Sequence, residues 1–411
     1  MSFADLLPPH LARPHHFGIG TAVVWREMRR ERAGGHPVAP THREHLQSAL
    51  DWLARAQDAW PSGGVARGYT AAWNRYFKAR GWEPEYPETT GYIIPTLFLA
   101  AEHLERPDLA QRAERAARWE IDVQLRSGGV RAGVMGQPPL SSVFNTGQVI
   151  FGWLAALEAT GDQIFAQAAR RAADFLVDRL DPDGIWRRDT SHLADHRATL
   201  YNSRTAWALA AAGVRLGEQA YVDAARCALF ATQERQRENG WIPDCCLTDP
   251  VHPLVHTLAY AIQGLLEGGY LLNEPRLVDG AATAAAALRR GLRDDGWLSG
   301  RWSETWTPAA DFSCLTGTAQ IANVWLRLAR VTGDRAWIEP AERALRFLET
   351  TQNRTTRLDG LRGGIKGSFP FDGEYGRYET LSWATKFFAD AVMRHERLTA
   401  GLPEPGAAAL A

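Results

Sequence analysis

Two classes of apolar stretch alternate along the chain, both with the period of an α-helix. The first class is rich in Ala, Leu and Arg and shows one apolar face, at 45–57, 110–124, 166–180, 221–233 and 341–352. The second class carries few charges, at 91–104, 147–159, 203–216, 254–267, 318–331 and 381–393. A helix with one apolar face suits a surface, whereas a mostly apolar helix must be covered by others. The alternation predicts outer and inner helices in turn.

A glycine-containing turn follows each outer stretch. The turns are WPSGGV, RSGGV, DPDGIW, ENGWI, RDDGWL and LRGGI, anchored at Gly64, Gly129, Gly184, Gly240, Gly296 and Gly364. Spacings of 55 to 68 residues are longer than the common solenoid repeats and fit one helical hairpin with a long loop. Short connectors such as ATGD and VTGD link each inner stretch to the next outer one, as antiparallel neighbours require.

Six such units predict an all-α fold, an (α/α)6 toroid in a single domain. We expect the toroid to span residues 43–397, between an N-terminal extension at 1–42 and a flexible tail at 398–411. The long loops emerge at one end of an antiparallel ring, where the inner helices begin. Loops on a rigid scaffold commonly carry function, so we expect the site at that end.

Composition and charge narrow the classes of partner. The 46 basic and 47 acidic residues are dispersed, which argues against nucleic acid. Four Cys without CxxC spacing argue against a disulfide framework. Adjacent Cys245 and Cys246 suit tetrahedral zinc poorly, even with His252 or His256 nearby. We expect no metal and no cofactor.

Neither a secretory leader nor a membrane span is evident in the sequence. The first residues, MSFADLLPPHLARPHH, lack a basic region followed by an apolar one, and nowhere do eighteen apolar residues run together. The sequence therefore predicts a cytoplasmic protein without an integral membrane segment.

Polar residues recur where the inner stretches begin. Short side chains there suit helix caps, and this is the expected role of Thr90, Asn145, Asn202, Ser203 and Thr316. Capping does not explain polar residues inside apolar helices, which should face water or ligand: Gln148, Arg204, His256, Gln320 and Lys386. For His256 a core position is equally compatible with the pattern, and Lys386 should pair with a carboxylate. Asn145 and Tyr201 join the candidates for binding substrate.

Two loops are rich in aromatic and charged residues, the combination that binds the faces and hydroxyls of sugar rings. The first carries Arg67, Tyr69, Trp73, Trp82, Tyr86 and Glu88, and ring closure should place it beside the second, with Glu374, Tyr378 and Glu379. Trp241 follows another turn. A lid packed on itself is the alternative for the first loop.

The candidate chemistry is acid–base catalysis on a carbohydrate. A glycoside hydrolase needs one protonated and one ionised carboxyl group, for which Glu88 and Glu379 are the preferred pair. A lyase or uronate C5-epimerase would instead move a proton with Tyr86, another tyrosine or His256, while Asn145 or Arg204 neutralises the uronate. A non-catalytic glycan-binding module is the third alternative.

Several segments resemble known families. A Gln before the turn in AQDAWPSGGV and TQERQRENGW resembles the toroid group of six-hairpin glycosidases and triterpene cyclases. EYPETTGYIIPTLF at 85–98 and YGRYETLSWATKFFADAVM at 375–393 resemble a family of polysaccharide-biosynthesis proteins typified by VpsJ. This resemblance implies a role in making or remodelling exopolysaccharide, on a polysaccharide or lipid-linked oligosaccharide, in contact with a polysaccharide-synthesis complex. EYPETT at 85–90 is also similar to a stretch of glucuronyl C5-epimerases, which implies active-site roles for Tyr86 and Glu88.

Overall fold

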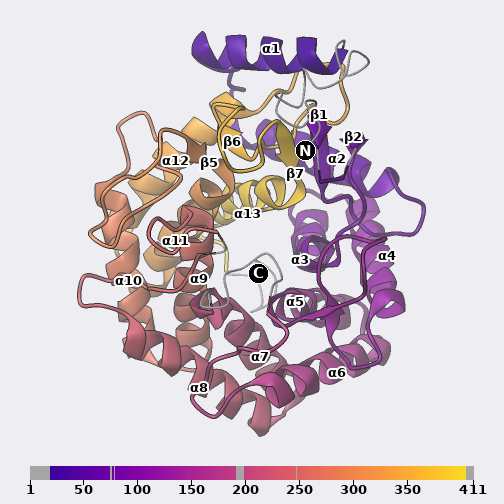
Figure 1. Ribbon diagram of the computed structural model, residues 1–411, viewed down its shortest axis with the longest axis vertical. Coiled ribbons are helices and arrows are strands. Elements are labelled where there is room, and N and C mark those ends of the chain that lie inside the picture. The colour runs from indigo at the N-terminus through magenta and orange to yellow at the C-terminus, as the bar shows by residue number, and fades with distance from the viewer. Residues whose placement is uncertain (1–18, 75, 78, 191–198, 247, 404–411) are drawn as a thin grey trace, which may run out of the picture.

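The predicted (α/α)6 toroid is confirmed by the computed structural model, which describes residues 19–74, 76–77, 79–190, 199–246 and 248–403. The outer helices are α2 (His42–Asp58), α4 (Pro107–Val123), α6 (Gln163–Arg179), α8 (Gln219–Arg235), α10 (Pro275–Arg290) and α12 (Ile338–Thr351). The inner helices are α3 (Pro87–His103), α5 (Val143–Thr160), α7 (Ser203–Leu216), α9 (Val255–Leu271), α11 (Leu315–Thr332) and α13 (Ser382–Thr399). Each inner helix packs on the next, and α13 packs on α3 and α2, which closes the ring (Figure 1).

The two classes of helix differ in burial as their sequences predict. Helix α5 is buried continuously from Val143 to Leu157, because inner neighbours and outer helices surround it. Helix α4 buries one face, including Leu109, Ala113 and Trp119. No helix of the described ranges is long and apolar enough to cross a membrane.

A glutamine joins each of several outer helices to the next. The Gln124 amide donates to the carbonyl of Gly128 at 2.7 Å and to the carbonyl of Ala168, on α6, at 3.1 Å. Gly128 has φ +88°, and a Cβ there would lie 2.2 Å from the Arg171 carbonyl oxygen, so only glycine fits. Equivalent glutamine contacts recur at Gln57, Gln236 and Gln352. The Gln before each of these turns therefore fixes the packing of neighbouring hairpins.

Small sheets organise the long loops. Strand β1 (Gly68–Asn74) pairs with β2 (Ala79–Trp82) and, across the seam of the ring, with β7 (Glu379–Leu381), where Thr70 faces Glu379. The first and last long loops thus lie side by side, as ring closure predicts. The other sheets pair β3 (Val130–Arg131) with β4 (Ser141–Ser142) and β5 (Ser313–Cys314) with β6 (Ser368–Phe369).

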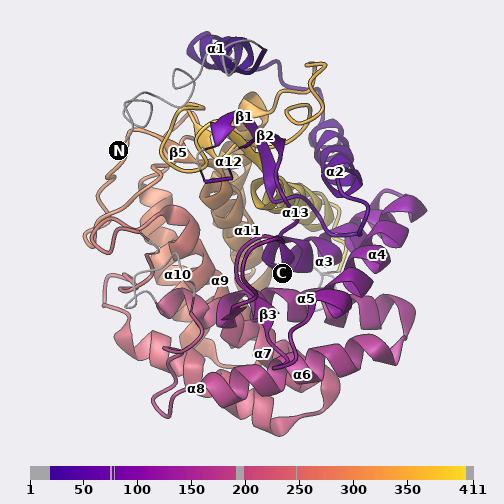
Figure 2. The same cartoon turned by 45° about the vertical axis from the view of Figure 1, so that its right-hand side comes forward.

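The segment predicted as an N-terminal extension carries a further helix, α1 (Ile19–Arg32). It lies outside the ring, beside β1 and the loop around β6 (Figures 1 and 2). The rest of that extension up to residue 18, and the end of the predicted tail from residue 404, lie outside the described residues.

One carboxyl group inside the fold has no partner among the described residues. Glu120 of α4 is 0% exposed, and neither of its side-chain oxygens has a hydrogen bond. Burial raises its pKa well above the usual range, so the folded state holds its proton more tightly than the unfolded state does. The contribution of Glu120 to stability should therefore be most favourable below pH ~4.5 and become less favourable as pH rises, by up to about 1.4 kcal/mol per pH unit.

Replacing Glu120 by Met, which has a similar volume and no ionisable group, is expected to stabilise the protein. The gain in the free energy of unfolding should be larger at pH 8 than at pH 5. Folding of the wild type requires Glu120 to take up a proton, which becomes less favourable as pH rises, and the Met variant takes up none at this position. Urea unfolding at both pH values measures it. An equal gain at the two values would show that the carboxyl group does not titrate between the folded and unfolded states.

Candidate functional site

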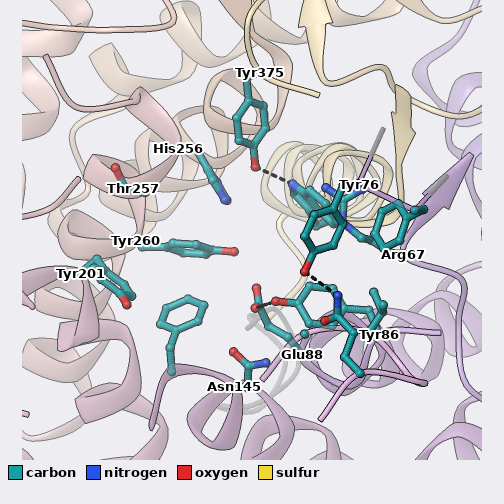
Figure 3. A pocket seen from close by; sticks show the side chains of 16 residues that line it. Arg67, Tyr76, Tyr86, Glu88, Asn145, Tyr201, His256, Thr257, Tyr260 and Tyr375 are labelled. Carbon is teal, nitrogen blue, oxygen red and sulfur yellow. Dashed lines mark hydrogen bonds between the residues drawn. The ribbon is translucent and has the colours of Figure 1, made fainter. Parts of the chain in front are cut away.

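A cavity opens among the N-termini of the inner helices, at the end of the ring that carries the long loops (Figure 3). Its volume of about 190 Å³ compares with the roughly 10–15 Å³ that one water needs, so it admits a ligand of many atoms. It is lined by Arg67, Tyr76, Phe77, Tyr86, Glu88, Gly133, Val134, Gln137, Phe144, Asn145, Tyr201, His256, Thr257, Tyr260, Tyr375 and Trp383. The wall is aromatic with few charges, as a sugar-binding pocket requires.

Glu88 is the carboxyl residue of this wall. It stands in the first turn of α3, directly after Pro87, and its carboxylate accepts a hydrogen bond from the Tyr86 hydroxyl (Figure 3). Burial raises the pKa of Glu88 to about 7, against the opposing effects of the Tyr86 hydrogen bond and of the Arg67 and Arg204 charges. A substantial fraction of Glu88 thus carries a proton at neutral pH, and it can act as an acid.

Glu379 lies behind Arg67 in a buried cluster at the seam. Arg67 Nη1 contacts Glu83 Oε2 at 2.5 Å and Glu379 Oε2 at 3.1 Å, and Asn74 Nδ2 contacts both carboxyl groups at 3.3 and 2.7 Å. Burial and the nearby Glu379 raise the pKa of Glu83 to about 7, although the Arg67 charge opposes this, so a substantial fraction of Glu83 carries a proton at neutral pH. Arg67 also packs over the Trp383 ring at 4.9 Å.

His256 enters the cavity from the first turn of α9 as a neutral ring. Burial, with a smaller effect of the Arg204 charge, lowers its pKa to about 4. Its Nδ1 lies 2.7 Å from Gln320 Oε1, an acceptor, so Nδ1 carries the hydrogen and Nε2 the lone pair. The ring packs on Tyr260 at 4.5 Å and Tyr375 at 5.4 Å. His256 can therefore accept a proton at neutral pH.

Beneath the cavity lies a buried charged layer. Arg204 donates to Gln148 at 2.7 Å and Gln263 at 2.5 Å, and its guanidinium lies 5.2 Å from the Tyr260 ring centre. Lys386 pairs with Asp390 at 2.7 Å, as the sequence predicts. The Arg204 charge acts on the cavity, where it lowers the pKa of both Glu88 and His256.

The predicted site residues divide into two groups. Those that the structure brings to the cavity wall are Arg67, Tyr86, Glu88, Asn145, Tyr201 and His256. Those that lie outside the wall are Tyr69, Trp73, Trp82, Gln148, Arg204, Trp241, Gln320, Glu374, Tyr378, Glu379 and Lys386. Three of the latter stand directly behind wall residues: Glu379 behind Arg67, Gln320 behind His256, and Arg204 behind Tyr260.

Several aromatic residues of the second group pack within the fold. The Trp82 ring packs on Trp52 and Tyr69 at 5.2 and 5.3 Å, and the Trp241 ring packs on Trp306 at 5.1 Å. The Tyr378 ring contacts Phe371. Glu374 pairs with Arg301 at 2.8 Å and borders a separate groove with Asp311, Asp372 and Arg377.

Asn145 does not cap α5, contrary to the predicted role. Ser142 holds that position, and its hydroxyl accepts from the Asn145 backbone N–H at 3.4 Å. The Asn145 side chain donates to the Arg131 carbonyl at 2.9 Å, which turns it toward the cavity. Thr90 is likewise no cap, because it lies inside α3. Its hydroxyl accepts a hydrogen bond from the backbone N–H of Val65, in the preceding loop, at 2.9 Å.

Sequence reasoning missed ten of the sixteen residues of the wall. Tyr260 lies one helical turn after His256, and this i+4 spacing was a usable signal. Tyr375 stands on the second of the two predicted loops and Trp383 in the first turn of α13 after it, and the Trp383 ring N–H donates to the Tyr375 hydroxyl at 2.8 Å. No sequence signal marked the hairpin residues Gly133, Val134 and Gln137. Gln137 hydrogen-bonds to the Tyr76 hydroxyl across the rim (Figure 3).

Replacing Tyr86 by Phe is expected to raise the pKa of Glu88, because the phenol stabilises the ionised carboxylate. The alkaline limb of a rate that depends on protonated Glu88 should move upward by about one to two pH units, given roughly 1.5–3 kcal/mol for a hydrogen bond to a charged group. A pH–rate profile measures it. Tyr221→Phe is the matched control, since Tyr221 donates to Asp174 on the outer ring. An alkaline limb at an unchanged pH would show that the Tyr86 hydroxyl does not affect the pKa of Glu88.

Comparison with known proteins agrees with the architecture. An unsaturated glucuronyl hydrolase specific for heparin is similar over 87% of this chain and 98% of its own, with 17% identity and a TM-score of 0.68. The cellobiose 2-epimerase from Bacillus thermoamylovorans B4167 is similar over 92% and 100%, with 12% identity and a TM-score of 0.65. The chain shares their fold. No family model and no curated protein matches the chain, so its resemblance to VpsJ-like proteins stays a prediction.

Proposed function

We propose that this protein is a carbohydrate-active enzyme, and that it cleaves a glycosidic bond with Glu88 as the proton donor. The observation that carries the proposal is the carboxyl group of Glu88, which reaches an aromatic cavity and has a pKa of about 7. Departure of a sugar alkoxide needs an acid that is protonated at the working pH. The similarity to a glucuronyl hydrolase and a sugar epimerase supports the same class of substrate.

The proposed second group is Glu379, with Arg67 between it and the cavity. A ligand that displaces Arg67 from Glu379 would open the Glu379 side chain to the side of the cavity where Arg67 lies, and we assign Glu379 the role of the base that activates water. The resemblance to polysaccharide-biosynthesis proteins adds the proposed setting, which is remodelling of an exopolysaccharide or of a lipid-linked oligosaccharide.

A uronate C5-epimerase or lyase is the second candidate, and one observation favours it. His256 lines the cavity directly, is neutral and presents Nε2 as an acceptor, whereas Glu379 does not reach the wall. With Glu88 as the acid and His256 as the base, the cavity holds both groups that proton exchange at carbon needs. Tyr260 and Tyr201 add phenols to the same wall.

Incubation with neutral and uronic-acid oligosaccharides in D₂O, read by mass spectrometry, tests both candidates. Shorter products that carry added water support hydrolysis, unsaturated ends indicate a lyase, and deuterium uptake at constant length indicates an epimerase. Binding without any of these changes would overturn the proposal in favour of a glycan-binding module.

Two substitutions then distinguish Glu379 from His256 as the catalytic partner of Glu88. If the paired carboxylates act, Glu379→Gln should abolish turnover and His256→Gln should reduce it less. If proton exchange at carbon occurs, the order should reverse. Circular dichroism and thermal unfolding of each variant confirm that the fold is kept.

A further inference from the structure

Helix α1 presents two faces of opposite charge. Its inward face carries Glu27 and Glu31, which pair with buried Lys366 at 2.9 and 2.8 Å. Glu31 also accepts from the Phe371 backbone N–H at 2.8 Å, and Met28 packs on the Phe371 cluster. These contacts hold α1 on the outside of the ring, against β1 and the loop around β6 (Figures 1 and 2).

The outward face, which we call the arginine face, consists of Trp25, Arg26, Arg29, Arg30 and Arg32. All five are exposed, and Trp25 is 67% exposed. At helical spacing, Trp25, Arg29 and Arg32 lie on the side opposite Glu27 and Glu31, and Arg26 and Arg30 lie on the flank next to that side. The two acids of this helix therefore neutralise Lys366 inside the protein, and the four arginine side chains stay exposed. Of these, Arg26 donates from Nε to the Ala22 carbonyl of the same helix at 3.2 Å.

These four arginines differ from most surface arginines of the protein. Arg112 pairs with Asp58 at 2.7 Å, Arg187 with Asp183 at 2.7 Å and Arg237 with Glu304 at 2.5 Å. None of the four α1 arginines forms an ion pair with any carboxylate in the described part of the chain. Four cations without an ion pair on about two helical turns, from Arg26 to Arg32, form a local cationic patch in a protein of net charge −1.

We propose that the arginine face binds the surface of a lipid bilayer that contains anionic phospholipids. Anionic headgroups complement the four guanidinium groups, each of which strengthens binding to such a surface about fivefold. Trp25, at the N-terminal end of the patch, distinguishes a bilayer from a soluble polyanion, because an exposed indole beside arginines suits the depth of the headgroups. This inference is independent of the proposed chemistry.

The test is co-sedimentation of the full chain with vesicles of phosphatidylcholine, with and without about one third phosphatidylglycerol. The protein should pellet with the anionic vesicles only, and less at about 1 M than at about 0.1 M NaCl, because salt screens the attraction. Replacing Arg26, Arg29, Arg30 and Arg32 together by Gln should lower the partition coefficient by about a hundredfold or more. Trp25→Ala should lower it severalfold.

The matched control replaces Arg215, Arg276, Arg290 and Arg335 by Gln. These four arginines are exposed and lie elsewhere on the ring, and their replacement changes the net charge by the same amount. The control variant should pellet like the wild type. Failure of the wild type to bind anionic vesicles, or equal losses in the two variants, would overturn the proposal. So would binding of a soluble polyuronate that depends on the arginine face without any binding to vesicles.

Discussion

Replacing Glu88 by Gln is expected to lower kcat by roughly three orders of magnitude, within the range that general acid catalysis contributes, and to leave binding of the oligosaccharide largely unchanged. Glutamine keeps the shape of the side chain and cannot supply the proton. In the wild type, the rate should fall as pH rises through about 7, because the pKa of Glu88 is raised to about 7 and its acid form is lost above that value. Turnover assays and calorimetric titration measure both parts.

The matched control for this substitution lies on the same helix. Glu102 stands near the other end of α3 and is exposed, so Glu102→Gln should retain full activity. A Glu88→Gln variant with wild-type kcat and an unchanged fold would remove Glu88 from the chemistry and leave His256 as the titratable residue to examine next.

Replacing Lys366 by Met should reduce the free energy of unfolding at pH 7.5 by about 3–5 kcal/mol, the usual cost of removing one partner of a buried ion pair. Lys366 is 2% exposed, and the carboxylates of Glu31 and Glu27 raise its pKa although burial opposes this. Burial alone would raise the pKa of Glu27, but the His36 hydrogen bond and Lys366 lower it to about 2. The stabilising contribution of Glu27 is thus present above about pH 4.5 and lost as pH falls toward 2. Urea unfolding measures the change.

The pH dependence of this variant identifies its cause. Without Lys366, the buried glutamates should take up protons, so the destabilisation should be smaller at pH 4.5 than at pH 7.5. A triple variant that also carries Glu27→Gln and Glu31→Gln should recover part of the loss. Arg377→Met, an exposed change on the same loop, should stay within about 0.5 kcal/mol of the wild type. A single variant as stable as the wild type would show that α1 is held mainly by its apolar contacts.

The architecture followed from local patterns because helical hairpins bury their faces against near neighbours. The outer helix at 45–57 is covered by other helices on one face, and the inner helix at 91–104 is covered on nearly all faces. This difference is visible in the sequence as one apolar face in the first stretch and a mostly apolar second stretch. The glutamine before the turn is equally local, since Gln57 and Gln124 bond to their own turn and to the next outer helix. Helix α1 was not predicted, because its inward face carries two glutamates whose partner Lys366 is distant in the sequence.

The site was predictable only in part. Glu88 and Tyr86 could be singled out because they adjoin the start of an inner helix, and all these helices begin at one end of the ring. Sequence polarity could not tell a wall residue from a supporting one. Gln148 and Gln320 look alike on apolar helices, yet each hydrogen-bonds to another buried side chain, Arg204 or His256.

The sequence by itself determined the helical hairpins, their order, and the end of the ring at which polar residues gather, because each depends on periodicity and on neighbours along the chain. Only the tertiary structure decided which side chains reach the cavity. It placed Arg67 between Glu379 and the cavity, and it turned Tyr260 and His256 to the wall. The physical reason is that a buried polar group is satisfied by whichever partner the closed ring brings within hydrogen-bonding distance, and that partner lies on another hairpin.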